Sequence, residues 1–218
     1  MTALPRPDFV VFDLDGTLAD SQAGILASFH ATLRRLGRQV RDEELRQLIG
    51  PPLAESFERL GIATPEIPEV VESYRAHYGE YGVDQSRLYD GIDEVLEALR
   101  VEGVRLAVAT AKRVDFAVRM LANLEVLELF EVVCGASLDG VRNTKGEIVD
   151  DALRQLNPSP LDKGWLVGDR REDVVAALGH SLTAVGVLWG YGSTEELADG
   201  GANLLISSPL DLLDLRVV

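Results

Sequence analysis

Short apolar runs that alternate with stretches of helical periodicity are the feature that most constrains this chain. The first run, Phe9–Phe12, is continuous, rich in aromatic and β-branched residues, and ends at Asp13. Such a run is typical of a strand buried on both faces of a parallel sheet. Further runs lie at residues 104–109, 131–134, 165–167, 184–188 and 203–206, and helical patterns at 114–127, 147–156, 173–178 and 194–198. This alternation predicts an α/β fold with a doubly wound parallel sheet.

The alternation is interrupted once, by a segment of amphipathic helical patterns without a convincing strand. In its first helix, residues such as Ile25 and Leu33 form one apolar stripe. We therefore predict an inserted all-helical domain over residues 17–87, and a core domain built from residues 1–16 and 88–218.

Charge and cysteine content limit the class of protein. The chain has 36 acidic against 21 basic residues, so nucleic acids and anionic membrane surfaces would be repelled. Its single cysteine, Cys134, cannot form an internal disulfide, and no apolar stretch approaches the ~18 residues that a membrane span needs. We expect a cytoplasmic protein with a small-molecule partner; its oligomeric state stays open.

Polar residues close the apolar runs. Asp13 and Asp15 follow the first run, Thr110 the second, and Asp169 the fourth, with Asp173 four residues further on. Ligands of open parallel sheets bind at the carboxyl ends of the strands. We therefore expect these carboxylates and the hydroxyl to meet at one edge of the sheet.

Carboxylates gathered in this way imply a cation, because they repel one another unless a positive charge lies among them. Hard oxygen ligands favour magnesium. The histidines His30, His77 and His180 have no paired metal-ligand spacing. Lys145, at the start of the helical stretch after the third strand, would offset the remaining negative charge beside a helix N-terminus.

Competing motifs fail on spacing. The sequence from Asp13 to Gly16 puts its glycine at the fourth position of a calcium loop rather than the sixth. The segment Gly190-Tyr191-Gly192 lacks the third glycine of a dinucleotide loop, because Glu195 stands there. Calcium-loop and nucleotide-loop interpretations are therefore excluded.

Taken together, DLDGT at residues 13–17, Thr110, Lys145 and GDRRED at residues 168–173 resemble the haloacid dehalogenase superfamily. The likeness covers nearly the whole chain. Within the superfamily, the helical insert and the segment Trp189-Gly190-Tyr191-Gly192 look like the phosphoglycolate phosphatase group. The resemblance implies a Rossmann-like hydrolase core that carries a helical cap.

The resemblance also implies roles for four residues. Asp13 would be the nucleophile that becomes an aspartyl-phosphate, and Asp15 the acid that protonates the leaving group and then the base that activates water. Thr110 would donate a hydrogen bond to a phosphoryl oxygen. Lys145 would offset charge on the phosphoryl group and on Asp13.

Magnesium is the implied cofactor. The resemblance assigns it to Asp13, the backbone carbonyl of Asp15, and Asp169, with Asp173 in support directly or through water. Thr17 would be a turn residue rather than a catalyst.

Two departures from the family pattern leave the active-site lysine open. Ala111 stands where the family often has asparagine, and Gly146 where it often has proline. Lys112, two residues after Thr110, competes with Lys145 for the role. The strand connection favours Lys145, and for Lys112 we expect an exposed position at a helix entry.

The surroundings of the site contain further candidate residues. We expect Arg170 to form an ion pair with Glu172 or Asp173 rather than to bind phosphate. Residues 50–53 and 189–191 are candidate substrate contacts, although ordinary turn and packing roles explain them equally well.

Hydrolysis of a small phosphomonoester, phosphoglycolate-like or a sugar phosphate, is the leading function, because Asp15 supplies the acid and base that haloacid dehalogenases do not need. A sugar-phosphate phosphomutase on the same core is the alternative. A noncatalytic module that binds metal or phosphate is a third possibility, and the complete residue set disfavours it.

Overall fold

The first apolar run forms an interior strand of a six-stranded parallel sheet. The computed structural model describes residues 6–138 and 143–215, so the ends of the predicted core domain lie outside the described residues. The strand order is β5-β4-β1-β6-β7-β8, which confirms the predicted doubly wound sheet. The strands are β1 (Phe9–Phe12), β4 (Arg105–Arg113), β5 (Val132–Ala136), β6 (Gly164–Gly168), β7 (Thr183–Val187) and β8 (Leu204–Ile206).

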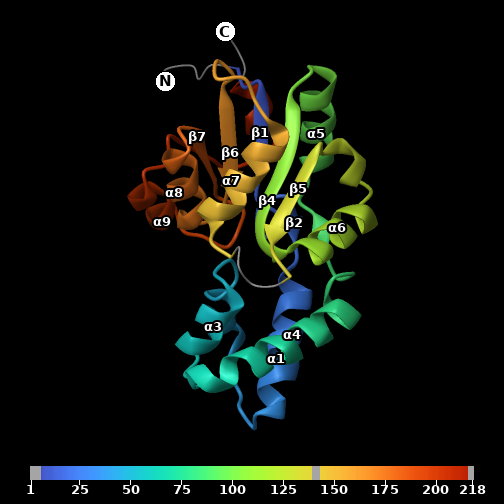
Figure 1. The fold of residues 1–218 in the computed structure, drawn as a ribbon, viewed down its shortest axis with the longest axis vertical. Helices are drawn as coiled ribbons and strands as arrows, with labels where there is room; N and C mark the ends of the chain where they lie inside the picture. The colour runs from blue at the N-terminus through green and yellow to red at the C-terminus, as the bar shows by residue number, and fades with distance from the viewer. Residues whose placement is uncertain (1–5, 139–142, 216–218) are drawn as a thin grey trace.

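Helices cover both faces of this sheet (Figure 1). Val10 and Phe12 point into the core that α5 and α6 help to build, whereas Phe9 and Val11 point into the core beneath α7, α8 and α9. The run is therefore buried on both faces, as its continuous apolar character predicts. The helices are α5 (Ile92–Val101), α6 (Val114–Asn123), α7 (Lys145–Leu156), α8 (Arg171–Gly179), α9 (Thr194–Gly200) and α10 (Asp211–Asp214).

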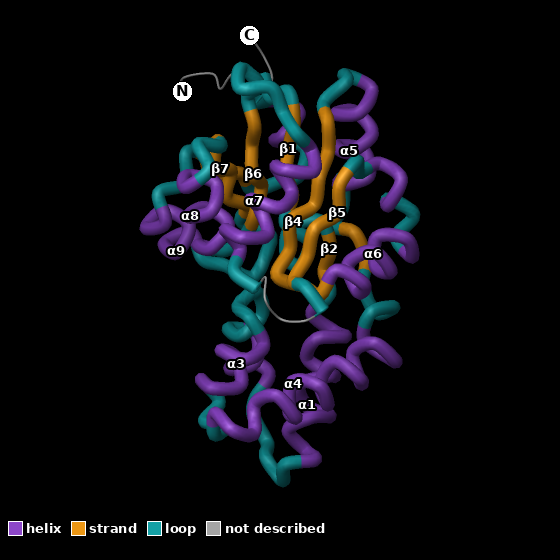
Figure 2. The backbone as a smooth tube through the Cα atoms, in the orientation of Figure 1, coloured by secondary structure: helices purple, strands orange, loops and turns teal. Residues whose placement is uncertain are grey.

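A separate helical unit, which we call the cap, lies at the end of the sheet that carries the strand C-termini (Figures 1 and 2). It is joined to the core through two short antiparallel strands, β2 (Ala19–Asp20) and β3 (Arg87–Leu88). The cap elements are α1 (Gln22–Arg35), α2 (Asp42–Arg46), α3 (Leu53–Arg59), the 3₁₀ turn η1 (Thr64–Glu66), α4 (Ile67–His77) and the π-helical turn η2 (Tyr78–Gly82).

Two local expectations differ from the structure. The two-residue strands β2 and β3 lie within or beside a segment where the pattern shows no convincing strand, because two residues are too few to show a period. The helical pattern at 114–127 runs too far: α6 ends at Asn123, and a 3₁₀ turn, η3 (Leu127–Leu129), follows. Leu124 and Leu127 still pack against the core, so the apolar spacing continues after the helix has ended.

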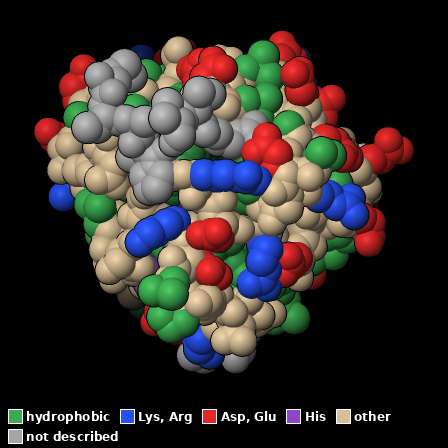
Figure 3. Space-filling view, turned by 90° about the horizontal axis from the view of Figure 1, so that it is seen from above, with side chains coloured by type: hydrophobic (Ala, Val, Ile, Leu, Met, Phe, Trp, Pro, Cys, Tyr) green, Lys and Arg blue, Asp and Glu red, His purple; other side chains and the backbone are tan. Residues whose placement is uncertain are grey.

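Surface charge is mixed. Acidic and basic side chains are interspersed on the face seen in Figure 3. Among the described residues, the helices are too short or too polar to span a membrane.

Candidate active site

Asp13 follows the last residue of β1, and the turn after it is built around Gly16. The amide of Asp13 donates to the carbonyl of Val167 at 2.9 Å, which ties the residue to the end of β6. Gly16 has a φ of 87°, and its amide donates to the carbonyl of Ala19 at 2.9 Å. A side chain at Gly16 would collide with the carboxylate of Asp169. Glycine is therefore needed both for the backbone conformation and for the approach of Asp169.

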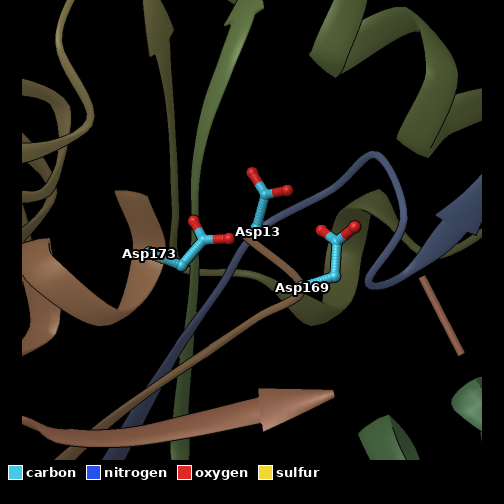
Figure 4. A group of neighbouring side chains, drawn as sticks. All are labelled: Asp13, Asp169 and Asp173. Carbon is cyan, nitrogen blue, oxygen red and sulfur yellow. The ribbon is translucent and has the colours of Figure 1, made fainter. Parts of the chain in front are cut away.

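Three buried carboxylates meet at this edge of the sheet (Figure 4). Asp13 follows β1, Asp169 follows β6, and Asp173 lies in the first turn of α8. One oxygen from each lies within 4.8 Å of the others. The structure thus brings together three of the residues that the strand-end pattern singles out.

Neutral donors hold two of these carboxylates. Asp169 accepts from the Thr17 hydroxyl at 3.2 Å and from the backbone amide of Tyr191 at 2.7 Å. Asp173 accepts from the backbone amide of Arg170 at 3.0 Å. Thr17 therefore orients a predicted metal ligand, a function beyond that of a turn residue.

Lys145 is the cation of the cluster. It is the first residue of α7, whose start is fixed by a capping box between Thr144 and Glu147. The Lys145 ammonium lies 2.5 Å from Asp13 Oδ1 and 2.6 Å from Asp173 Oδ1. The helix start therefore delivers a positive charge to the carboxylate at the end of β1.

The cluster carries more negative than positive charge. Burial raises the pKa of Asp13, and although Lys145 lowers it, the net value is about 7. Burial also raises the pKa of Asp169 well above its usual range, and the Asp13 and Asp173 carboxylates add to the effect. Burial lowers the pKa of Lys145, but Asp13 and Asp173 raise it by more, so this ammonium stays charged.

These residues fit a divalent cation. When all three carboxylates are ionised, they and one ammonium leave two negative charges, which one divalent ion would neutralise. All three groups are carboxylates, so they offer oxygen atoms as ligands rather than the nitrogen of His or the sulfur of Cys. A hard ion such as magnesium prefers oxygen ligands. The oxygen ligands and their uncompensated charge thus both fit a divalent cation such as magnesium.

Asp15 lies beside the cluster and is held by two other side chains. Its Oδ1 accepts from the Ser21 hydroxyl, and its Oδ2 lies 3.0 Å from the ammonium of Lys112. The expectation of an exposed Lys112 is wrong: its side chain is 6% exposed and points into the site. Arg113, which directly precedes α6, is the residue at the helix entry, and it pairs with Asp115.

A cavity of about 190 Å³ opens over Asp13, between the core and the cap. Asp15, Thr110, Lys112 and Lys145 line its core side. The cap contributes a largely apolar wall: Ile25, Phe29, Leu48, Ile49, Val71, Tyr74 and Tyr78. The structure therefore places Thr110 and both candidate lysines around one space with the carboxylates.

The candidate substrate contacts divide into two groups. Gly50, Pro51, Pro52 and Leu53 line the cavity. Residues 189–191 are not among the lining residues; instead, Trp189 donates from its indole to the carbonyl of Thr17 at 3.0 Å. That segment therefore supports the turn after β1 and lies outside the lining of this cavity.

Arg170 has a different partner from the predicted ones. Its guanidinium pairs with Glu196 at 2.8 Å, and it also donates to the backbone carbonyl of Ile49 in the cap. The expected ion pair with Glu172 or Asp173 is wrong, because the Arg170 side chain extends from the core towards Ile49 in the cap. Arg170 therefore connects the segment after β6, which carries Asp169, to the cap.

Sequence reasoning missed three contributors to the site: Ser21, Tyr78 and the backbone of Tyr191. Ser21 lies six positions after Asp15, whereas Tyr78 lies far along the insert, and no local pattern marks either one as a site residue. Tyr191 does belong to a segment that the resemblance singles out, although for another role. In the folded chain Ser21 reaches Asp15, the backbone of Tyr191 reaches Asp169, and Tyr78 reaches Lys112.

Comparison with known proteins gives a consistent result. Residues 10–187 match the family model described as haloacid dehalogenase-like hydrolase. The crystal structure of a predicted phosphatase from Clostridium acetobutylicum superposes with a TM-score of 0.91 at 35% identity, covering 95% of this chain and 97% of that one.

The names of two curated relatives state two different activities. A 5'-nucleotidase from Pseudomonas aeruginosa is 36% identical over 197 residues, which are 89% of this chain and 88% of the relative. The tyrosine-protein kinase PtkA of Mycobacterium tuberculosis is 42% identical over 190 residues, 87% of this chain. This chain spans 65% of the length of that mycobacterial relative.

Proposed function

Because the chain belongs to the haloacid dehalogenase-like hydrolases, we propose that it is a magnesium-dependent phosphatase that hydrolyses a small phosphomonoester through an aspartyl-phosphate on Asp13. The observation that carries the proposal is the position of the Asp13 carboxylate, 2.5 Å from the Lys145 ammonium in a cavity that Asp15 and Thr110 also line. A nucleophile, a cation, a proton donor and a hydroxyl thus face one space.

The reaction proceeds in two steps on this chain. In the first, an oxygen of Asp13 attacks phosphorus, the bond from phosphorus to the leaving oxygen breaks, and Asp15 gives that oxygen a proton. In the second, Asp15 takes a proton from water, the water oxygen attacks phosphorus, and the bond between phosphorus and Asp13 breaks. Inorganic phosphate leaves, and both carboxyl groups return to their starting states.

The remaining residues stabilise charge. Lys145 faces the carboxylate that becomes phosphorylated, and Thr110 offers a hydroxyl to a phosphoryl oxygen. Asp13, the backbone carbonyl of Asp15, Asp169 and Asp173 would hold magnesium. When bound, magnesium supplies Lewis-acid stabilisation of phosphoryl oxygens.

The cavity supports a small substrate. Its volume of about 190 Å³ lies below the roughly 300–1,000 Å³ of sites for drug-sized ligands. Arg75 from the cap and Arg113 from the core also line it and could meet a second anionic group. A phosphoglycolate-like ester or a sugar phosphate agrees with this size and charge.

Two other functions use the same core. A sugar-phosphate phosphomutase remains the alternative from the sequence. The name of the mycobacterial relative adds a second, transfer of a phosphoryl group to a protein tyrosine. We rank the phosphatase first, because the 5'-nucleotidase relative and the structure named a predicted phosphatase both match this chain over most of their own length.

The test is a panel assay with purified protein and magnesium. The panel contains phosphoglycolate, sugar phosphates, nucleoside 5'-monophosphates and p-nitrophenyl phosphate, and the readout is inorganic phosphate. Release of phosphate without a bisphosphate activator supports the phosphatase. Isomerised sugar phosphate without phosphate release would favour the mutase, and labelled tyrosine formed from ATP would favour the kinase-like reaction.

A further inference from the structure

Lys112 lines the active site but has no role in the two-step reaction. It lies in β4, two residues after Thr110, and its side chain is almost fully buried. Its ammonium makes two polar contacts with side chains, one with Asp15 Oδ2 at 3.0 Å and one with the hydroxyl of Tyr78 at 2.7 Å. Asp15 belongs to the core, whereas Tyr78 belongs to the cap. Lys112 therefore joins the proposed acid and base to the cap.

Burial does not neutralise this ammonium. Burial lowers the pKa of Lys112, but Asp15 and Tyr78 raise it by more, so the net pKa lies above the ordinary lysine value. The ammonium also lies 4.4 Å from the centre of the Tyr78 ring, a distance suited to a cation–π contact. A charged donor in a dry site orients its acceptors strongly.

Both oxygens of Asp15 are thus held by groups whose positions depend on the cap. Ser21, which donates to Oδ1, directly precedes the first cap helix, α1. Lys112, which contacts Oδ2, is itself bonded to Tyr78 near the end of the cap segment. The orientation of Asp15 is therefore tied to both ends of the cap.

Tyr78 is firmly placed. Its ring stacks on Tyr74 with centroids 5.9 Å apart and meets Phe116 of α6 edge-on at 5.5 Å. It is 2% exposed and its backbone belongs to the cap turn η2, so the cap sets the position of its hydroxyl. If the cap swings away, Lys112 loses this acceptor.

We propose that Lys112 is a positioning residue that couples the closed cap, through the Tyr78 hydroxyl, to the orientation of the Asp15 carboxylate. This proposal rests on the proposed function, because it gives Asp15 the acid step of that reaction. It explains why a second lysine is buried in a site where Lys145 already contacts Asp13. The site would be complete for proton donation only when the cap is closed.

The test compares two esters that differ in their need for a proton. An alkoxide leaving group needs the proton of Asp15, whereas p-nitrophenolate leaves without one. Because kcat/KM covers the steps up to departure of the leaving group, later hydrolysis of the aspartyl-phosphate does not affect it. We expect Lys112→Met to lower kcat/KM for an alkyl phosphate by about 10²-fold, and for p-nitrophenyl phosphate by less than about threefold.

Two further variants separate positioning from packing. Tyr78→Phe keeps the ring and removes the hydroxyl, so we expect a loss of about tenfold on the alkyl ester alone. Lys112→Arg keeps the positive charge and should recover part of the Lys112→Met loss. Arg119→Met is the matched control, because Arg119 also joins the core to the cap, through the carbonyl of Gly79 and Asp84, without touching Asp15. It should affect both esters equally.

Hydrogen exchange provides a second readout that does not need turnover. We expect the amides of residues 78–82 to lose protection in Lys112→Met and in Tyr78→Phe, with circular dichroism unchanged. Unchanged protection would overturn the link to the cap. Equal losses on both esters, or no loss on either, would overturn the link to Asp15. If the wild-type protein releases phosphate from neither ester, the proposed function fails, and hydrogen exchange still decides whether Lys112 holds the cap.

Discussion

The ammonium of Lys145 lies 2.5 Å from the carboxylate of Asp13, although 132 positions separate the two residues. The contact depends on the sheet order, because β5 lies beside β4 and β4 beside β1, so the start of α7 comes back over the end of β1. It also explains why the buried Asp13 can serve as a carboxylate. A lysine beside a buried carboxylate stabilises its charged form, which burial alone would disfavour.

Asp13→Asn should abolish turnover and leave the fold intact. The amide has the shape of the carboxylate but cannot form the phosphoenzyme. We expect kcat to fall by far more than tenfold. A tenfold fall is a loss of about 1.4 kcal/mol of transition-state stabilisation, which is still compatible with a supporting role for Asp13. Phosphate release measures the effect, and circular dichroism checks the fold. Residual activity within about tenfold of wild type would exclude Asp13 as the nucleophile.

Lys145→Ala should lower kcat/KM by about 10²-fold or more on alkyl and aryl esters alike, because its charge acts on the phosphoryl group and on Asp13 rather than on the leaving group. Lys163→Ala is the matched control: Lys163 is exposed and its backbone amide bonds Asp8, at the far end of β1. The control should keep wild-type activity. A loss confined to alkyl esters would instead give Lys145 the behaviour expected of Lys112.

The strand-end pattern predicted the sheet and the meeting of Asp13, Thr110, Asp169 and Asp173, because parallel strands deliver their carboxyl ends to one edge. The position of Lys145 also follows from this logic. What the pattern could not predict are contacts fixed by side-chain direction. Whether Lys112 faces the site or the solvent depends on the register of β4 near an irregularity between Thr110 and Arg113, which the sequence does not show.

Contacts between the core and the cap were the hardest to predict. Arg170 has acidic neighbours in sequence, yet it pairs with Glu196, 26 positions away, and with the backbone of Ile49. The bond from Ser21 to Asp15 depends on the turn around Gly16 and on the hinge strand β2. Short hinge strands and packing between domains carry no periodicity, so a single sequence contains no signal for them.

Arg170→Ala should weaken cap closure. Arg170 donates to the carbonyl of Ile49 and packs against Gly50, both of which line the cavity. Losing this contact should raise KM by roughly fivefold, about 1 kcal/mol of binding, with a smaller change in kcat. Arg171→Ala, a substitution at the exposed first residue of α8, should leave both constants unchanged. A fall in kcat with constant KM would instead indicate that Arg170 acts on the reacting groups.

The stabilisation of the protein by magnesium should grow as pH rises from about 4 to about 7. Without metal, burial and the Asp173 carboxylate keep the pKa of Asp13 at about 7, even though Lys145 lowers it, against 3.8 for a free carboxyl group. Between these values the folded chain holds a proton that the unfolded chain has lost, so its free energy of unfolding falls as pH rises. Magnesium binds the carboxylate form of Asp13 and competes with that proton, so it removes this fall in the free energy of unfolding.

The measurement is the unfolding midpoint at several pH values, with magnesium and with chelator, for the wild type and for Asp13→Asn. The amide does not titrate, so its curve in chelator should be flatter. A magnesium effect of the same size at every pH, or none at all, would contradict a metal site that includes Asp13.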